Sequence, residues 1–487
     1  MNILFSILSL VPILVLLLIS LLKGVKAGVY SGFIITTVLF FVWDSSFIAF
    51  PATLVSAFID TISILMIIFG ALLLHANMEQ VGFIEEIKIS LKKAHHDSSF
   101  QFYFLAFFLT AFFESVAGFG TPGAIVPLLL ISLGFSPILS IVVVLLIDGL
   151  FAITGAVGTP VIAGFGDNLN LQPSQINHIY IYASCFMIIS GAVILIFIKR
   201  FVVQENPKIS AYGWRMYFSV TIPFVILSFF LQELTGIVAA TVMGIIAYFF
   251  FFTNKNLVWK PWLPYAILMF LLLMPKIITP LQPLIAFKLS FNEIFNSSVS
   301  ASFSPFRSPL FPFVFAAICT AILGKKRKMQ LKPVFKKTLG VFFILFPSLC
   351  ITQLMLSSGS EMPSMIDTMS ILFAKTGSAY PLISPFIGVM GTFITGSTTV
   401  SNLIFGSVQY NTAESLSLSS EIILAMQLNG ASLGNAICLF NIISAAAVAG
   451  VHQYTKILSK NIAPVLLATF VISVIGMIII NLIKISG

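Results

Sequence analysis

The sequence has 487 residues, of which 59% are hydrophobic and only 8% are charged. Soluble domains carry about 25% charged residues, so a water-exposed surface is excluded for most of this chain. The net charge of +9 lies mainly in loops between apolar stretches, which indicates the positive-inside rule of membrane proteins and argues against nucleic-acid binding.

Apolar stretches close to the length of a spanning helix follow one another from end to end, and each predicts a membrane-spanning α-helix. In chain order they cover residues 3–22, 28–43, 47–75, 100–113, 122–134, 137–152, 178–198, 216–232, 236–252, 261–274, 309–323, 338–356, 380–395, 421–451 (broken) and 462–484. We therefore predict a single all-α polytopic membrane domain, residues 1–487, with about 12–14 spanning helices in the cell membrane.

Basic residues are concentrated in alternate loops. The loops 23–27, 76–99, 199–215, 253–260 and 324–337 hold 18 of the 25 Lys and Arg residues, whereas the loops 44–46, 167–177 and 357–362 hold none. This asymmetry predicts that the first group of loops is cytoplasmic.

Two segments, 100–166 and 380–452, interrupt apolar helix with Gly-rich motifs at nearly equal spacing. The breaks lie at Gly118 and Gly155 in the first segment and at Gly396 and Gly434 in the second. By the loop assignment, the two segments cross the membrane in opposite directions. We therefore expect inverted repeats with broken helices or re-entrant hairpins, an architecture typical of secondary transporters.

These breaks are the predicted substrate site, because irregular backbone at bilayer depth persists only where it lines a cavity or is packed in protein. Each break leaves a half-helix N-terminus worth about half a positive charge, so two facing ends suit one carboxylate. Neither segment contains Lys or Arg. The predicted substrate-binding residues are Gly118, Gly120, Thr121, Gly158, Thr159, Gly396, Ser397, Thr398, Thr399, Ser401, Asn402 and Asn435.

Three carboxyl side chains fall at membrane depth. A charged carboxylate in the middle of a spanning helix costs about 3 kcal/mol on insertion scales, a cost that protonation relieves. Glu114 lies one turn before the first break and Asp148 one to two turns before the second, so we predict that both couple transport to protons. For Asp60, a functional role and a helix–helix hydrogen bond fit the sequence equally well.

Other signals are weak. The pattern Gly118-x-Gly120-x-x-Gly123 matches a dinucleotide-binding motif but lies in apolar helix without the strand that the motif requires. The histidines and cysteines have no metal-ligand spacing, and no nucleophile–base set is evident. We therefore predict a protein that is not an enzyme and uses no metal or cofactor.

The two segments resemble the lactate permease family of proton-coupled transporters of lactate and related hydroxy acids. The matching stretches are 112–122, 133–137 and 155–160 in the first segment, and 384–386, 395–402, 405–406 and 412–413 in the second. The resemblance implies a permease for lactate or a similar small monocarboxylate, working by proton symport. Another organic anion, or sodium coupling on the same fold, is the alternative. The expected partners are this anion, a proton and the bilayer, and the oligomeric state is open.

The chain departs from the family pattern at several positions. Thr398 stands where the family has Asp, and Asn435 where it has Lys, so an acid and a base are missing together. The family's Ser-Pro-Gln is replaced by 438–440, and its Asn-Thr-Ala-Pro by 148–151. Asp148 is thus a candidate replacement for the acid missing at position 398.

Overall fold

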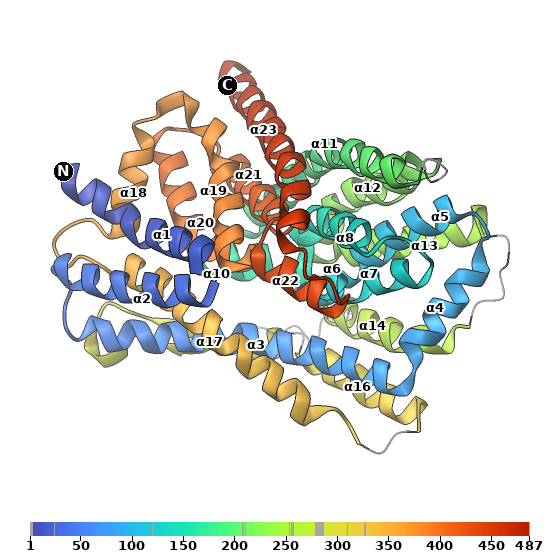
Figure 1. Ribbon diagram of the computed structural model, residues 1–487. Coiled ribbons are helices and arrows are strands. Elements are labelled where there is room, and N and C mark those ends of the chain that lie inside the picture. Colours follow the sequence, from blue (N-terminus) through green and yellow to red (C-terminus); the bar gives the residue numbers. More distant parts are fainter. Residues whose placement is uncertain are drawn as a thin grey trace. The chain divides into compact units, whose positions relative to one another are not determined.

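The computed structural model describes residues 3–23, 25–118, 120–206, 209, 211–252, 254, 258–277, 287–308, 310–325 and 328–486. Helices dominate this part of the chain (Figure 1). The chain divides into two compact units, Met1–Ala94 with Asn254–Ile366, and His95–Thr253 with Asp367–Gly487.

The first unit consists of long apolar helices and a small hairpin. Its elements are α1 (Ile3–Lys23), α2 (Val25–Val42), α3 (Ala49–Val81), α4 (Phe83–Ala94), α14 (Leu263–Ile277), β1 (Leu289–Phe291), β2 (Ala301–Phe303), α16 (Leu310–Leu323) and α17 (Leu331–Leu356). The strands pair antiparallel with Ser290 opposite Ser302. Helix α3 packs against both α16 and α17.

Asp60 takes part in this helix packing. The Gln353 side chain on α17 donates a hydrogen bond to Asp60 Oδ2 on α3 at 2.9 Å. Of the two roles that fit the sequence, the structure therefore gives Asp60 the helix–helix hydrogen bond.

The second unit contains both Gly-interrupted segments. The first segment runs through α5 (Ser98–Phe104), the π-helix η1 (Leu105–Leu109), α6 (Thr110–Ala117), α7 (Thr121–Ser132), α8 (Pro137–Phe151), η2 (Ala152–Thr154), α9 (Gly155–Val161), η3 (Ile162–Gly166) and α10 (Asp167–Leu169). It is followed by α11 (Pro173–Glu205), α12 (Gly213–Leu231), η4 (Gln232–Leu234) and α13 (Thr235–Phe250).

The second segment repeats the order of the first. After α18 (Met365–Ala374), it runs through α19 (Tyr380–Thr395), α20 (Thr398–Ser415), α21 (Ser420–Gly434) and α22 (Leu439–Val448), and α23 (Tyr454–Ser486) ends the chain. In each segment two helices meet at a Gly break, a short turn follows, and a second helix pair meets at another break. The helix after each turn has a Ser N-cap, Ser136 for α8 and Ser419 for α21.

Helices α19 and α21 approach unusually closely. A Cβ atom on Gly430 would overlap the carbonyl oxygen of Pro385, and one on Gly388 would overlap that of Gln427. Small residues permit such backbone contact between helices in lipid, where van der Waals packing drives association. Helix α20 packs beside both, so the three form one layered cluster (Figure 1).

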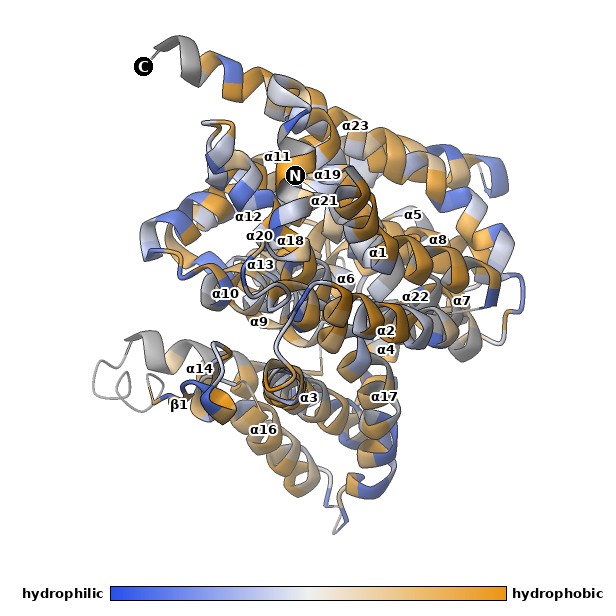
Figure 2. Ribbon diagram, turned by 90° about the vertical axis from the view of Figure 1, so that its left-hand side faces the viewer, coloured by the Kyte–Doolittle hydropathy of each residue, from blue (hydrophilic) through white to orange (hydrophobic). Residues whose placement is uncertain are grey.

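Most of the predicted spans coincide with helices. Among the described residues, six helical stretches are long and apolar enough to cross a membrane: Ser98–Ala117, Pro137–Gly166, Pro173–Glu205, Gly213–Phe250, Leu331–Leu356 and Tyr454–Leu482. Apolar residues predominate along the helices, whereas hydrophilic residues gather in the loops (Figure 2). The prediction of an all-α polytopic membrane protein is confirmed. Helix α20 lies outside the predicted spans, because its many Ser, Thr, Asn and Gln residues lower its mean hydropathy.

Candidate functional site

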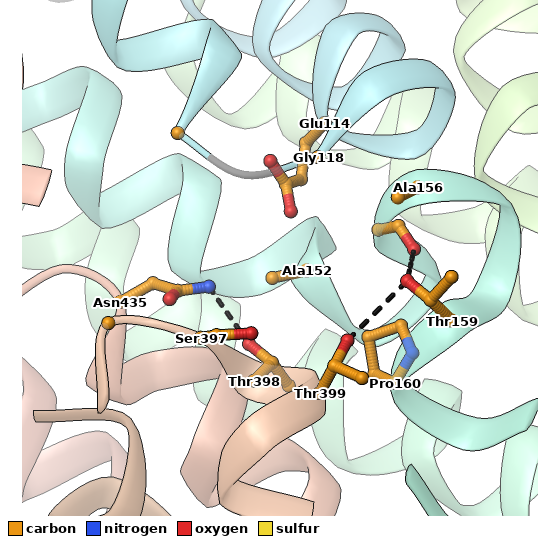
Figure 3. A pocket seen from close by; sticks show the side chains of 13 residues that line it. Glu114, Gly118, Ala152, Ala156, Thr159, Pro160, Ser397, Thr398, Thr399 and Asn435 are labelled. Carbon is orange, nitrogen blue, oxygen red and sulfur yellow. Dashed lines mark hydrogen bonds between the residues drawn. The ribbon is translucent and has the colours of Figure 1, made fainter. Parts of the chain in front are cut away.

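The four breaks of the second unit meet at one cavity (Figure 3). About 310 Å³ of empty space lies among its lining residues and at its open side. Its lining is uncharged apart from one carboxyl group, and consists of Glu114, Gly118, Gly120, Ala152, Gly155, Ala156, Thr159, Pro160, Gly396, Ser397, Thr398, Thr399 and Asn435.

The first break separates α6 from α7. Gly118 has φ 59° and Gly120 has φ 73°, a region that glycine enters without steric cost. A Cβ atom on Gly118 would lie 2.9 Å from the backbone nitrogen of Ala156, so glycine also permits contact with the next break. Thr121 then begins α7, with Pro122 in the first turn, where no N–H is needed.

The second break is a strained turn inside the stretch assigned to α9. Ala156, Val157 and Gly158 have φ values of 43°, 58° and 75°. Left-handed backbone costs a non-Gly residue about 1–3 kcal/mol, most of all a β-branched one, and such outliers cluster at functional sites. The turn is held by hydrogen bonds from the Thr159 hydroxyl to the Gly155 carbonyl, at 3.1 Å, and from the Tyr180 hydroxyl to that of Gly158, at 3.3 Å.

The third break joins α19 to α20. Gly396 ends α19 with φ 75°, and the Ser397 hydroxyl caps α20 by accepting the Val400 N–H at 3.3 Å. Thr398 and Thr399 are the first two residues of α20, so their N–H groups have no carbonyl partner within the helix. The positive end of an 18-residue helix therefore lies at the cavity.

The fourth break follows α21 and meets the third. The Asn435 amide donates to the Thr398 hydroxyl at 2.9 Å, and the Thr398 hydroxyl donates to the Ala431 carbonyl at 3.4 Å. The Asn441 amide holds Asn435 in turn, donating to its side-chain oxygen at 3.3 Å. The two positions where an acid and a base are absent relative to the family pattern are thus in direct contact.

One hydrogen bond joins the two segments directly at the cavity. The Thr399 hydroxyl of α20 donates to the Thr159 hydroxyl at 3.4 Å (Figure 3). Both residues line the cavity, so this contact lies at its wall.

Two buried carboxyl side chains lie next to each other at the cavity wall. Glu114 is 4% exposed and Asp148 is 1% exposed, and the two side chains lie close enough to interact. Glu114 points into the cavity (Figure 3), and the absence of a side chain on Gly155 makes room for it, since a Cβ there would lie 2.5 Å from Glu114 Oε1. Among the described residues, Glu114 Oε2 and Asp148 Oδ1 have no hydrogen-bond partner.

Not every predicted site residue lines the cavity. Those that do are Gly118, Gly120, Thr159, Gly396, Ser397, Thr398, Thr399, Asn435 and Glu114; those outside the lining are Thr121, Gly158, Ser401, Asn402 and Asp148. Ser401 donates to the Gly388 carbonyl at 3.0 Å, and Asn402 to the Pro160 carbonyl at 2.9 Å. The lining also contains four residues that are not among the predicted binding residues, Ala152, Gly155, Ala156 and Pro160, of which the last three belong to the motif 155–160.

The comparisons with known proteins agree with this architecture. The model of the L-lactate permease family matches residues 4–267 and 257–483. The chain belongs to the L-lactate permease family. It is therefore a transporter and not an enzyme, and a multi-pass protein of the cell membrane.

Several proteins named as permeases are similar to this permease, two of the three below over most of its length. A putative L-lactate permease of Haemophilus influenzae is 27% identical over 87% of this chain and 88% of its own. The L-lactate permease of Escherichia coli strain K12 is 23% identical over 84% and 83%. The glycolate permease GlcA of the same strain is 34% identical over a shorter stretch, 28% of this chain and 24% of its own.

Proposed function

We propose that this permease moves lactate, or a similar small 2-hydroxy monocarboxylate, across the membrane together with a proton. The observation that carries the proposal is the adjacent pair of buried carboxyl side chains, Glu114 in the lining of a cavity without Lys or Arg and Asp148 beside it. The relatives named as L-lactate and glycolate permeases support a small hydroxy acid as the substrate.

The anion is held by helix ends and hydroxyl groups. Helices α7 and α20 both begin at the cavity, and each N-terminus is worth about half a positive charge. Together they balance one carboxylate, whereas a dicarboxylate would leave about one negative charge without compensation. The hydroxyl groups of Ser397 and Thr399 lie in the lining, where they can bond the carboxylate and the 2-hydroxyl group.

The proton is held by the carboxyl pair. Two ionised carboxylates side by side would repel each other strongly in a site shielded from water, so we expect the pair to hold at least one proton. One proton travelling with one monocarboxylate moves no net charge, so a pH gradient drives transport and a membrane potential alone does not.

Uptake of labelled L-lactate into proteoliposomes tests the proposal. We expect accumulation when the outside is more acidic, none when a potassium diffusion potential is imposed at equal pH, and weaker competition by succinate than by glycolate. Uptake driven by the potential at equal pH contradicts an electroneutral proton symport. Accumulation driven by a sodium gradient alone favours the sodium-coupled alternative, and absence of monocarboxylate uptake under every gradient overturns the function.

A further inference from the structure

A chain of buried side-chain amides runs through the second unit behind the cavity. The Tyr380 hydroxyl donates to Gln409 Oε1 at 2.6 Å, and the Gln409 amide donates to Gln427 Oε1 at 2.8 Å. The Gln427 amide donates to Asn402 Oδ1 at 3.3 Å, and the Asn402 amide donates to the Pro160 carbonyl at 2.9 Å. We call Gln409, Gln427 and Asn402 the amide relay. All three side chains are fully buried.

The relay has one direction, which its other bonds fix. The second amide hydrogen of Gln409 goes to the Ser384 carbonyl at 2.9 Å, and that of Gln427 to the Ser401 hydroxyl at 3.3 Å. Turning any of these amides over would place two donors or two acceptors face to face. The carbonyls of Ser384 and Pro160, which can only accept, therefore fix the orientation of the relay.

The relay ends at the wall of the cavity. Asn402 lies one turn after Thr399 on the same face of α20, and Pro160 follows Thr159 directly. The Asn402–Pro160 bond and the Thr399–Thr159 bond therefore join one face of α20 to one stretch of the second break. Gly164 allows this close approach, because a Cβ there would lie 2.8 Å from the Cβ of Asn402.

We propose that the amide relay positions Thr399 against Thr159 and so sets the width of the cavity, which makes Gln427 a positioning residue for substrate size. The inference rests on the proposed function, since it concerns the same cavity. Without the Gln427 amide, the Asn402 side chain loses the donor that fixes its oxygen. That oxygen can then turn toward the Pro160 carbonyl, where two acceptors repel and α20 moves away from the break.

A buried polar network can also serve only to specify the fold. The fold-specifying role and the positioning role predict different effects of a substitution in the amide relay. A purely structural role lowers the amount of folded protein and hence the transport of all substrates in proportion. A positioning role changes the preference between substrates of different size.

The test compares Gln427→Met, which keeps the length of the side chain without its hydrogen bonds, with Asn429→Leu. Asn429 is a matched control, because its buried amide lies on the same helix but bonds the carbonyls of Ala183 and Ala425. In proteoliposomes, lactate and the larger 2-hydroxybutyrate compete with labelled lactate. We expect Gln427→Met to shift the ratio of their half-inhibitory concentrations about three- to tenfold toward the larger acid, the effect of one net hydrogen bond. Asn429→Leu should leave the ratio unchanged.

A second variant covers the case in which Gln427→Met does not fold. Gln427→Leu also removes every side-chain hydrogen bond of Gln427, with a branched apolar side chain in place of the straight one, so it should shift the ratio in the same direction. An unchanged ratio in either transporting variant, an equal shift in Asn429→Leu, or loss of folding in both Gln427 variants overturns the inference. Absence of lactate uptake by the parent protein would instead overturn the proposed function, and the inference with it.

Discussion

The Asn435 amide donates a hydrogen bond to the Thr398 hydroxyl at 2.9 Å, and this contact joins the end of α21 to the start of α20 at the cavity. Both side chains are neutral and buried. Two neutral side chains therefore connect the two helices at positions where the family pattern has an acid and a base.

This contact predicts compensation between two charge-introducing substitutions. Thr398→Asp or Asn435→Lys alone leaves a buried charge without its partner, which costs about 3–5 kcal/mol. The double variant should recover much of that loss, because the two side chains already meet. Thermal unfolding of the purified protein followed by size-exclusion chromatography measures the four proteins of this cycle. A double variant less stable than both single variants would show that the two positions do not pair.

Replacing the carboxyl pair should uncouple transport from the proton. Glu114→Gln and Asp148→Asn keep shape and hydrogen bonding but cannot release a proton. We expect both to lose accumulation driven by a pH gradient while lactate exchange between equal pools continues. Accumulation equal to that of the parent in both variants would move proton coupling to other residues.

A hydroxyl group in the lining should contribute to substrate affinity. Thr399→Val removes the hydroxyl at almost constant volume, so lactate affinity should fall a few-fold to about tenfold, as expected for about 0.5–1.5 kcal/mol. The control is Thr469→Val on α23, where the buried hydroxyl bonds only the carbonyl of Val465. Equal affinities of the two variants would place the substrate elsewhere.

The close packing of α19 on α21 predicts a severe effect of one methyl group. Gly430→Ala would push a Cβ into the Pro385 carbonyl, so one helix must shift, with a cost of about 1–3 kcal/mol or more. Gly340→Ala on α17 is the control, since nothing lies within 4 Å of its new Cβ and alanine favours helix. Unfolding temperatures should fall for the first variant and hold or rise for the second; a Gly430→Ala protein as stable as the parent contradicts the packing.

The loop charges predict the orientation in the membrane. Cysteines at Gln330 and Asn170, introduced into a chain lacking the four native thiols, should differ in their reaction with an impermeant thiol reagent on intact cells. The second should be labelled and the first should not. The opposite result would invert the topology.

The sequence identifies most helices because each is bounded by charged or Gly/Pro-rich loops, and α8 and α19 end within a residue of the expected positions. The breaks can also be predicted from the sequence, because glycine readily adopts the positive φ values that Gly118 and Gly396 have in the structure. The left-handed Ala156 and Val157 could not be foreseen, because neither residue favours that backbone by itself. Only the surrounding contacts hold them there.

The amide relay and the pairing of Glu114 with Asp148 were also hidden, for a different reason. Gln409 and Gln427 are single polar residues within their helices, and their meeting depends on how α20 and α21 pack. Likewise, sequence spacing placed each carboxyl near its own break but not beside the other. Hydrogen bonds between residues far apart in the sequence depend on how the helices pack, and the spacing of apolar residues along one helix does not predict that packing.

The polarity of α20 has a consequence for how the protein is made. Its buried Ser401, Asn402 and Gln409 side chains each oppose partition of an isolated helix into lipid. Their hydrogen-bond partners lie on α9, α19 and α21, and Gln427 of α21 leaves the ribosome after α20. We therefore expect α20 to insert into the bilayer together with α21, because two of its buried amides find their partner only when Gln427 has been made.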